Sequence, residues 1–302
     1  MLRVGTRGSK LALAQTGHVV DALRALDPSR AIEIVVVATD DSAAGDKSRY
    51  VNAIEQRLRS QEIDLGVHSA KDLPGEESPG LMIVGVPPRV DPADTLCGVT
   101  SLDALPQGAV VGTSSLRRSA QLLAARPDVR VRPLRGNIDT RLGRLSEGAF
   151  DAIVLAAAGL ARLGAGGEIP QAALDFVPAP GQGCLALQVR DIDLTTTAVI
   201  GALSDPASHR ELRAERAAAS GLTASCSTPL GVRAEVEPGA ADGDADRLTV
   251  RGWLGLPDGS SFVEDEVGGL ASEAQLLGHL LAQRMRAAGG DDILARAEEM
   301  AA

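Results

Sequence analysis

Short apolar, β-branched segments alternate with helical patterns over roughly the first 200 residues, and this alternation restricts the fold more than any other feature. LRVGT, AIEIVVVAT and IDLGVHS have the composition of strands, and they are separated by the helical patterns LALAQTGHVVDALRAL and VNAIEQRLRS. Strands that alternate with amphipathic helices are typical of α/β domains with a largely parallel sheet. We therefore predict an α/β fold for this part of the chain.

The pattern begins twice. The strand, polar turn and helix of VGTRGSKLALAQ recur in AVVGTSSLRRSAQLLAARP, so that Val4-Gly5-Thr6 and Val111-Gly112-Thr113 take equivalent places. Residues 63–67 and 150–154 also correspond, because each segment leads from a helix into a strand. We predict two similar α/β domains that face each other across a cleft. Strand ends and helix N-termini on both sides of such a cleft favour an anionic ligand.

The remaining sequence predicts how the domains are connected. VPAPGQGCLALQVRD is rich in Pro and Gly and then strand-like, as expected if the chain returns from the second domain to the first. A helix from about Ser204, a sheet in LTVRGWLGLPDGSSFVEDEV and a last helix in SEAQLLGHLLAQRMRAAG predict a small α+β domain. The expected domains are residues 1–87 with 184–201, residues 88–183, and residues 202–302.

Composition excludes several classes of partner. The net charge of −10 argues against sequence-independent binding to nucleic acid, which needs a basic surface. The chain has neither a signal-peptide pattern nor an apolar segment near the roughly 20 residues of a membrane span, so we expect a cytoplasmic protein without a membrane partner. Cys97, Cys184 and Cys226 are scattered and no zinc motif occurs, so we expect neither a disulfide framework nor a metal site.

Arginines cluster at the two turns that begin the predicted domains. Arg7 lies in TRGS, and Arg117 and Arg118 lie in TSSLRR. A positive charge in the first turn of a helix opposes the helix dipole, so these residues indicate an anion site. The hydroxyl groups beside them could act only as helix N-caps, and this alternative stays open.

Two further segments add arginines at turns. LRGNIDTRLGRL contributes Arg135 and Arg141 around a Gly-Asn turn, and AAAGLARLG contributes Arg162. Each residue alone could be a solvated surface charge. Six arginines at the turns of two facing domains together favour a ligand that carries several carboxylates.

Asp72 and Cys226 are the other candidates for chemistry. Lys71 and Asp72 follow a strand in GVHSAKDLP and could be an exposed turn pair, but an aspartate at a cleft could also stabilise a cation or transfer a proton. Nearby arginines would keep it ionised and burial would raise its pKa, and the sequence does not decide between them. Cys226, in TASCSTP, has no neighbouring His, and its chemistry alone indicates an inert buried thiol.

Seven motifs in this order resemble the motif series of the porphobilinogen deaminase (hydroxymethylbilane synthase) family: TRGSKLALAQ, HSAKDLP, VGTSSLRR, LRGNIDTRL, AAAGLARLG, PGQG and SCSTPLG. The resemblance runs from residue 2 to about residue 235. It implies two periplasmic-binding-protein-like (type II) domains that form a cleft, with a small C-terminal α+β domain. It also implies a cytoplasmic, monomeric transferase that deaminates porphobilinogen and joins four units into the linear tetrapyrrole hydroxymethylbilane.

The resemblance assigns roles residue by residue. Cys226 matches the cysteine that carries a dipyrromethane cofactor through a thioether, which replaces the inert-thiol interpretation. Asp72 matches the catalytic aspartate, with Lys71 beside it. The residues expected to bind carboxylates of cofactor and substrate are Arg7, Ser9, Ser69, Thr113, Ser114, Ser115, Arg117, Arg118, Arg135, Gly136, Asn137, Arg141, Arg162 and Gln182.

The chain departs from the family pattern in one loop. Thr39-Asp40-Asp41-Ser42 replaces the family's Thr-Arg-Gly-Asp turn, and the following loop is shorter. Lys47 and Tyr50 are the counterparts of a family lysine and phenylalanine in this lid. Ala224-Ser225 replaces the common Gly-Gly before Cys226. A shorter lid could change substrate closure or rate.

Two other functions stay open at this point. The same cleft could belong to a non-catalytic or degenerate binder of a polycarboxylate, although a binder needs neither Asp72 nor Cys226. A ligand-sensing domain of a transcription regulator would need a helix-turn-helix segment, and we expect none because the first strand begins at residue 2. Enzymatic function is therefore the favoured hypothesis.

Overall fold

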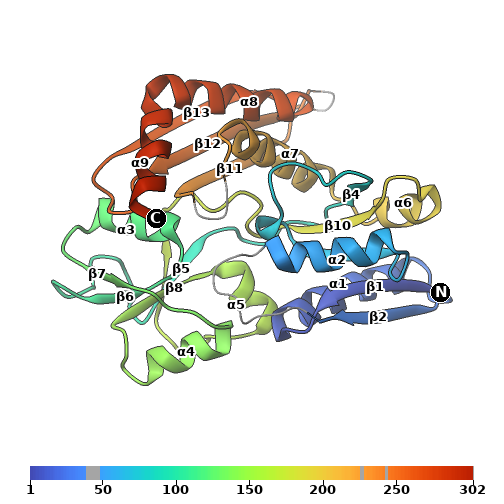
Figure 1. Ribbon diagram of the computed structural model, residues 1–302, viewed down its shortest axis with the longest axis horizontal. Helices are drawn as coiled ribbons and strands as arrows, with labels where there is room; N and C mark the ends of the chain where they lie inside the picture. The colour runs from blue at the N-terminus through green and yellow to red at the C-terminus, as the bar shows by residue number, and fades with distance from the viewer. Residues whose placement is uncertain (39–47, 225–227, 242–243, 302) are drawn as a thin grey trace.

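The computed structural model describes residues 1–38, 48–224, 228–241 and 244–301, which form three β-sheets with their covering helices (Figure 1). Two sheets have five strands each and the third has three. In Figure 1 the first sheet lies at the right, the second at the lower left, and the three-stranded sheet above both. No helix among these residues is long and apolar enough to cross a membrane.

The first sheet has the strand order β2-β1-β3-β10-β4. Its strands are β1 (Leu2–Arg7), β2 (Ile32–Val37), β3 (Leu65–Ser69), β4 (Leu81–Gly85) and β10 (Leu185–Arg190). Strand β1 is parallel to β2 and β3, whereas β10 is antiparallel to β3 and β4. Helix α6 (Leu194–Gly201) follows β10 and contributes Ile200 to the core of this sheet.

Helices α1 (Lys10–Leu26) and α2 (Ser48–Arg59) cover opposite faces of the first sheet. Alternate residues of a strand point to opposite faces, so Val4 packs with α1 while Gly5 faces the other side. A Cβ at Gly5 would lie 2.2 Å from Cδ1 of Ile63, which explains the glycine at this position.

The second sheet repeats the arrangement of the first, with the order β7-β6-β8-β5-β9. Its strands are β5 (Asp94–Cys97), β6 (Val110–Gly112), β7 (Arg130–Arg132), β8 (Ala152–Ala156) and β9 (Gln171–Leu174). Strand β6 is parallel to β7 and β8, and β5 is antiparallel to β8 and β9. Its helices are α3 (Leu116–Ala125), α4 (Ile138–Ser146) and α5 (Ala157–Leu163).

The chain crosses between the two sheets twice. After the first crossing, at residues 86–93, β5 joins the second sheet, and after the second, at residues 175–184, β10 returns to the first. Because β1 and β6 occupy the same place in the two strand orders, the topology agrees with the correspondence predicted between Val4-Gly5-Thr6 and Val111-Gly112-Thr113. The exact domain boundaries at residues 87/88, 183/184 and 201/202 stay a prediction.

The third sheet is antiparallel and consists of β11 (Leu230–Glu237), β12 (Arg247–Gly255) and β13 (Phe262–Leu270). Helices α7 (Pro206–Gly221) and α8 (Ala274–Met285) pack on it through Ala218 and Leu281. The last helix was predicted over SEAQLLGHLLAQRMRAAG, but α8 ends at Met285 and a further helix, α9 (Asp291–Ala301), follows a kink where Gly289 has φ 103°. The fold is two α/β domains and a C-terminal α+β domain, as predicted.

Candidate active site

A cavity of about 100 Å³ lies where β1 and β3, which are parallel neighbours, end at the same edge of the first sheet. Five predicted site residues line it, namely Arg7, Ser9, Ser69, Lys71 and Asp72. Asp72 ends the short 3-10 helix that directly follows β3. The other walls are largely apolar, formed by Leu11, Ala12, Val51, Ile54 and Val67. The structure thus brings the N-terminal set of candidates together around the carboxylate of Asp72.

Local hydrogen bonds hold this part of the cavity. Ser9 is the N-cap of α1, and its Oγ accepts from the backbone N–H of Ala12 at 3.2 Å. The hydroxyl of Ser69 exchanges hydrogen bonds with the side-chain amide of Gln15 at 3.0 and 3.1 Å. The expectation that Arg7 lies in the first turn of a helix is wrong, because Arg7 is the last residue of β1 and α1 begins only at Lys10.

Gln182, on the second crossing, connects the two sheets. Its Oε1 accepts a hydrogen bond from Nζ of Lys71 at 3.1 Å. Its Nε2 donates to the carbonyl of Pro92 at 2.6 Å and to Oδ1 of Asp94 at 2.9 Å. Because Gln182 is 1% exposed, these contacts form a fixed polar connection between Lys71 and the first strand of the second sheet.

Arg117 and Arg118 are buried and share the carboxylate of Asp94. Nη1 of Arg117 lies 2.6 Å from Oδ2, and Nη2 of Arg118 lies 2.8 Å from Oδ1. Burial alone would raise the pKa of Asp94, but the two guanidinium charges outweigh it and lower this pKa far below its ordinary value. The sequence argument required a negative partner for these arginines, and within the protein that partner is Asp94.

The hydroxyls at this second turn make local bonds. Oγ of Ser115 caps α3 and lies 3.4 Å from the backbone N–H of Arg118, while Oγ1 of Thr113 accepts from the N–H of Ser115 at 3.2 Å. The hydroxyl of Ser114 donates to the carbonyl of Leu134 at 3.0 Å. The hydroxyl groups at this turn therefore make local bonds, and that of Ser115 caps a helix, which was the alternative to ligand binding in the sequence analysis.

Arg135, Arg141 and Arg162 differ from the buried pair. Nε of Arg141 donates to the carbonyl of Gly136 at 2.7 Å, and Nη2 of Arg162 donates to the carbonyl of Gly183 at 2.8 Å. Burial lowers the pKa of both guanidinium groups. Within the residues that the structure describes, no carboxylate forms an ion pair with Arg135, Arg141 or Arg162. Such positive charges favour an anion that the protein itself does not provide.

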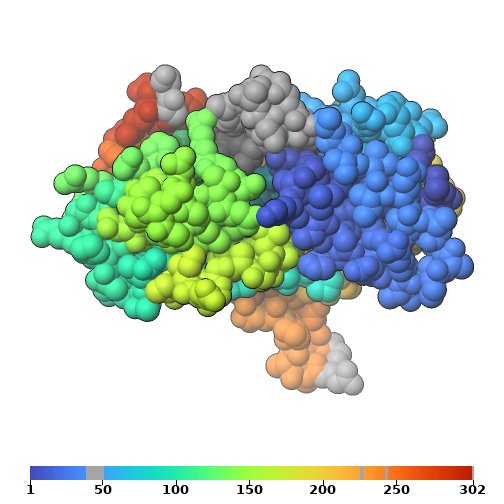
Figure 2. Space-filling model, turned by 90° about the horizontal axis from the view of Figure 1, so that it is seen from below, coloured from blue at the N-terminus to red at the C-terminus, as the bar shows by residue number. Residues whose placement is uncertain are grey.

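The turn that contains Gly136 and Asn137 begins α4. Oδ1 of Asn137 caps this helix by accepting from the N–H of Thr140 at 3.0 Å, and Gly136 has φ 108°, which favours glycine. Across the cleft, Nζ of Lys10 lies 2.6 Å from Oδ2 of Asp139. This ion pair joins the beginnings of α1 and α4, and the two α/β domains lie side by side (Figure 2).

Three residues of the site were missed by the sequence analysis: Gln15, His68 and Asp94. His68 lines the cavity and is buried, and burial lowers its pKa to about 4. It belongs to the HSAKDLP motif, so its position was a signal that could have been used. Asp94 gave no such signal, because 23 residues separate it from Arg117 and only the folded sheet brings the two together.

Some predicted residues cannot be placed. Lys47 and Cys226 lie outside the described residues, and of Tyr50 only the backbone, at the beginning of α2, is described. Ser225 is also outside them. Among the described side chains, no group of three or more His, Cys, Asp or Glu could hold a metal ion.

Comparisons with known proteins agree with this geometry. The family model for the porphobilinogen deaminase, dipyromethane cofactor binding domain matches residues 2–198, and that for the porphobilinogen deaminase C-terminal domain matches residues 209–287. The chain belongs to the porphobilinogen deaminase family. The porphobilinogen deaminase of Thermus thermophilus is 48% identical over an alignment of 301 positions, which covers 97% of this chain and 98% of the relative.

The chain is also similar to a second relative and, much more distantly, to a solved structure. The porphobilinogen deaminase of Brevibacillus brevis is 43% identical over 97% of this chain and 96% of its own length. A periplasmic His/Glu/Gln/Arg/opine family-binding protein from Silicibacter pomeroyi is 18% identical, with a TM-score of 0.40 over 67% of this chain and 88% of its own.

Proposed function

We propose that this member of the porphobilinogen deaminase family deaminates porphobilinogen and joins four units into hydroxymethylbilane on a dipyrromethane primer attached to Cys226. This residue-level proposal is supported by three arginines of the second α/β domain that form no ion pair with an acidic side chain among the described residues, namely Arg135, Arg141 and Arg162. Carboxylates of cofactor and substrate are the anions that these groups would bind.

The residues present fit a polyacidic cofactor. Arg135, Arg141 and Arg162 would bind its carboxylates from the second domain, and Arg7, Ser9 and Lys71 would bind from the cavity of the first. When bound, the dipyrromethane supplies the pyrrole carbon to which the first substrate unit is joined. Arg117 and Arg118 would act differently, because both already form ion pairs with Asp94.

Asp72 is proposed to perform the central electrostatic step. Its carboxylate would stabilise the positive charge that develops as the substrate's amino group leaves as ammonia, and it would accept or return a proton. The apolar walls around Asp72 strengthen this interaction, because they keep the local dielectric constant low. Lys71 donates to Gln182, which would orient it toward carboxylates at the mouth of the cavity.

The experiment that tests the proposal is the intact mass of the purified protein. We expect an excess of one dipyrromethane over the mass calculated from the sequence, and its loss in Cys226→Ser. Cys184→Ala is the matched control, because Cys184 is buried and burial raises the pKa of its thiol to about 12, which leaves no reactive thiolate. The control should keep the added mass.

An unmodified protein that stays unmodified after incubation with porphobilinogen would instead favour a degenerate binder of polycarboxylates. An added mass that survives in Cys226→Ser would refute the attachment site. The cytoplasmic location, the monomeric state and the effect of the shortened lid on rate stay predictions.

A further inference from the structure

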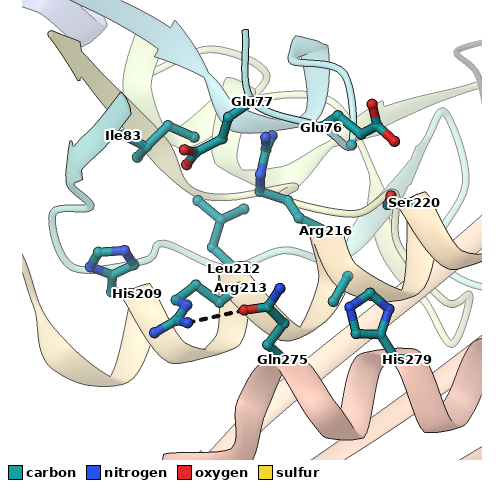
Figure 3. A pocket seen from close by; sticks show the side chains of 12 residues that line it. Glu76, Glu77, Ile83, His209, Leu212, Arg213, Arg216, Ser220, Gln275 and His279 are labelled. Atoms are coloured by element: carbon teal, nitrogen blue, oxygen red, sulfur yellow. Dashed lines mark hydrogen bonds between the residues drawn. The ribbon is translucent and has the colours of Figure 1, made fainter. Parts of the chain in front are cut away.

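A larger groove, of about 530 Å³, lies away from the candidate active site, between the first sheet and the third (Figure 3). Its walls are the loop that precedes β4 and the facing surfaces of α7 and α8. It shares no lining residue with the cavity around Asp72. The volume is within the range of roughly 300–1,000 Å³ that is typical of small-molecule sites.

One stripe of α7 forms the floor of the groove. His209, Arg213, Arg216 and Ser220 recur at intervals of three and four residues, so they lie on the same face of the helix. The opposite wall approaches this face closely, since a Cβ at Gly75 would lie 3.2 Å from the backbone N of Ser220. The groove is therefore a fixed junction between the first and third domains.

The two walls carry opposite charges. Arg213 and Arg216 project from α7, whereas Glu76 and Glu77 project from the loop (Figure 3). Within the described part of the chain, no ion pair joins these walls, and Arg213 donates only to Oε1 of Gln275, at 3.2 Å. Arg213 is thus directed toward Gln275, whereas the guanidinium of Arg216 extends toward Glu77 without forming an ion pair with it in the described structure.

Arg216 gives the most specific indication that the groove binds a ligand. Its Nη1 is buried and has no hydrogen-bond partner in the described structure. Its pKa is lowered by burial, which the charge of Glu77 opposes. A buried guanidinium N–H without an acceptor is costly, so the charge of Arg216 is incompletely satisfied by the described residues around it.

We propose that this groove is a second small-molecule site, which binds an amino-dicarboxylate: its carboxylates contact Arg216 and Arg213, and its primary ammonium group contacts Glu76 and Glu77. A simple anion would be repelled by the two glutamates, and a simple cation by the two arginines. Only a molecule with both charges matches both walls. His209 and His279 line the groove beside the arginines and add neutral or positive hydrogen-bond donors to the same wall.

The walls of the groove are continuous in sequence with the two segments that carry Asp72 and Cys226, the residues of the proposed reaction. The loop wall begins directly after Asp72 and Leu73, and α7 runs toward the segment that contains Cys226. An occupant that bridges the walls would hold the loop after Leu73 against α7.

Calorimetric titration of the purified holoprotein tests the site with two probes, L-glutamate and glutarate, which differ in the ammonium group. Both probes carry carboxylates that the arginines of the candidate active site could also bind, so the loss of binding in Glu77→Gln, which lies outside that site, is what assigns the binding to the groove. We expect L-glutamate to bind at least about tenfold more tightly than glutarate. Arg216→Met, which keeps an apolar stem, and Glu77→Gln, which alters only an exposed loop, should each weaken L-glutamate binding about tenfold or more.

Arg144→Met, on the exposed surface of α4, is the control and should leave binding unchanged. If Arg216→Met fails to fold, Glu77→Gln still decides the question. Absence of L-glutamate binding at millimolar concentration, equal affinity for glutarate, or binding that is insensitive to Glu77→Gln would each overturn the proposal.

Discussion

Asp72 is half-buried at the end of a 3-10 helix, where its carboxylate lines the cavity without supporting the core. We expect Asp72→Ala to lower kcat by about a thousandfold, as removal of a group that stabilises transition-state charge does, and to leave the thermal midpoint nearly unchanged. Steady-state rates and thermal unfolding measure both effects. Asp175→Ala removes an acid whose side chain is 97% exposed and should retain normal rates. Normal turnover in Asp72→Ala would remove this residue from the mechanism.

Arg141 and Arg144 occupy the same helix and differ in surroundings. Arg141 is partly buried and has no acidic partner in the described structure, whereas Arg144 is exposed and pairs loosely with Glu147. Arg141→Met should raise KM for porphobilinogen about tenfold or more, because one charge-assisted contact is lost, while Arg144→Met should not. Equal KM values in the two variants would show that Arg141 contacts no substrate carboxylate.

The local sequence predicted the turns of the site well, because Ser9, Ser115 and Asn137 each cap the helix that begins at the next residue. Such short-range bonds depend on residue type and spacing alone. The partner of Arg117 could not be predicted in this way. Asp94 on β5 lies within 2.6 Å of Arg117 on α3 because β5 and β6 both pair with β8, which is more distant in sequence. For the same reason the sequence indicated an external anion where the protein supplies its own.

Helix α3 and strand β5 are joined by charge, because Asp94 of β5 forms ion pairs with the two buried arginines of α3. Asp94 is fully buried, and its replacement by Asn leaves two guanidinium charges without a counter-ion. We expect Asp94→Asn to lower the free energy of unfolding by about 3–5 kcal/mol. Urea unfolding measures this, with Asp91→Asn, an exposed acid on the same crossing, as the control. A loss no larger than that of the control would show that other groups neutralise the arginines.

The contribution of Asp94 to the stability of the folded protein depends on pH, and the direction of this dependence follows from its lowered pKa. The pKa of Asp94 is lowered in the folded protein, so its contribution to stability is complete at neutral pH. This contribution is lost as the pH falls below about 4, the ordinary pKa of an aspartate. In that range the unfolded chain binds a proton at this residue more readily than the folded protein does.

For the whole molecule, His68 makes the free energy of unfolding depend on pH at higher pH values than Asp94 does. Burial lowers its pKa to about 4 from the ordinary value of 6.5, so between these values the unfolded chain binds the proton more readily. Stability should therefore fall as the pH is lowered from 6.5 to 4, by up to about 3 kcal/mol from this residue. Urea midpoints across this range should show a smaller slope in His68→Gln than in His18→Gln, an exposed control on α1. Identical slopes would assign the effect to other groups.

The three domains meet at one buried carboxylate, Glu215 of α7. Its two oxygens lie 2.7 and 3.2 Å from the guanidinium nitrogens of Arg89 on the first crossing. They also accept backbone hydrogen bonds from Gly181 on the second crossing, at 2.6 Å, and from Ala234 of β11, at 2.8 Å. One side chain thus links both crossings between the α/β domains to the C-terminal sheet.

Glu215→Gln keeps the shape of this side chain and leaves Glu211, whose Oε2 lies 3.2 Å from Nη1 of Arg89, as the remaining acidic partner of that buried guanidinium among the described residues. We expect the free energy of unfolding to fall by about 1–3 kcal/mol, measured by urea unfolding. Glu235→Gln, on the exposed face of β11, is the control and should change it by no more than about 0.5 kcal/mol. The apolar contact among Ala120, Val177 and Trp253 also joins the second domain to the third. If Glu215→Gln were as stable as the control, that apolar contact, rather than the buried carboxylate, would hold the C-terminal domain in place.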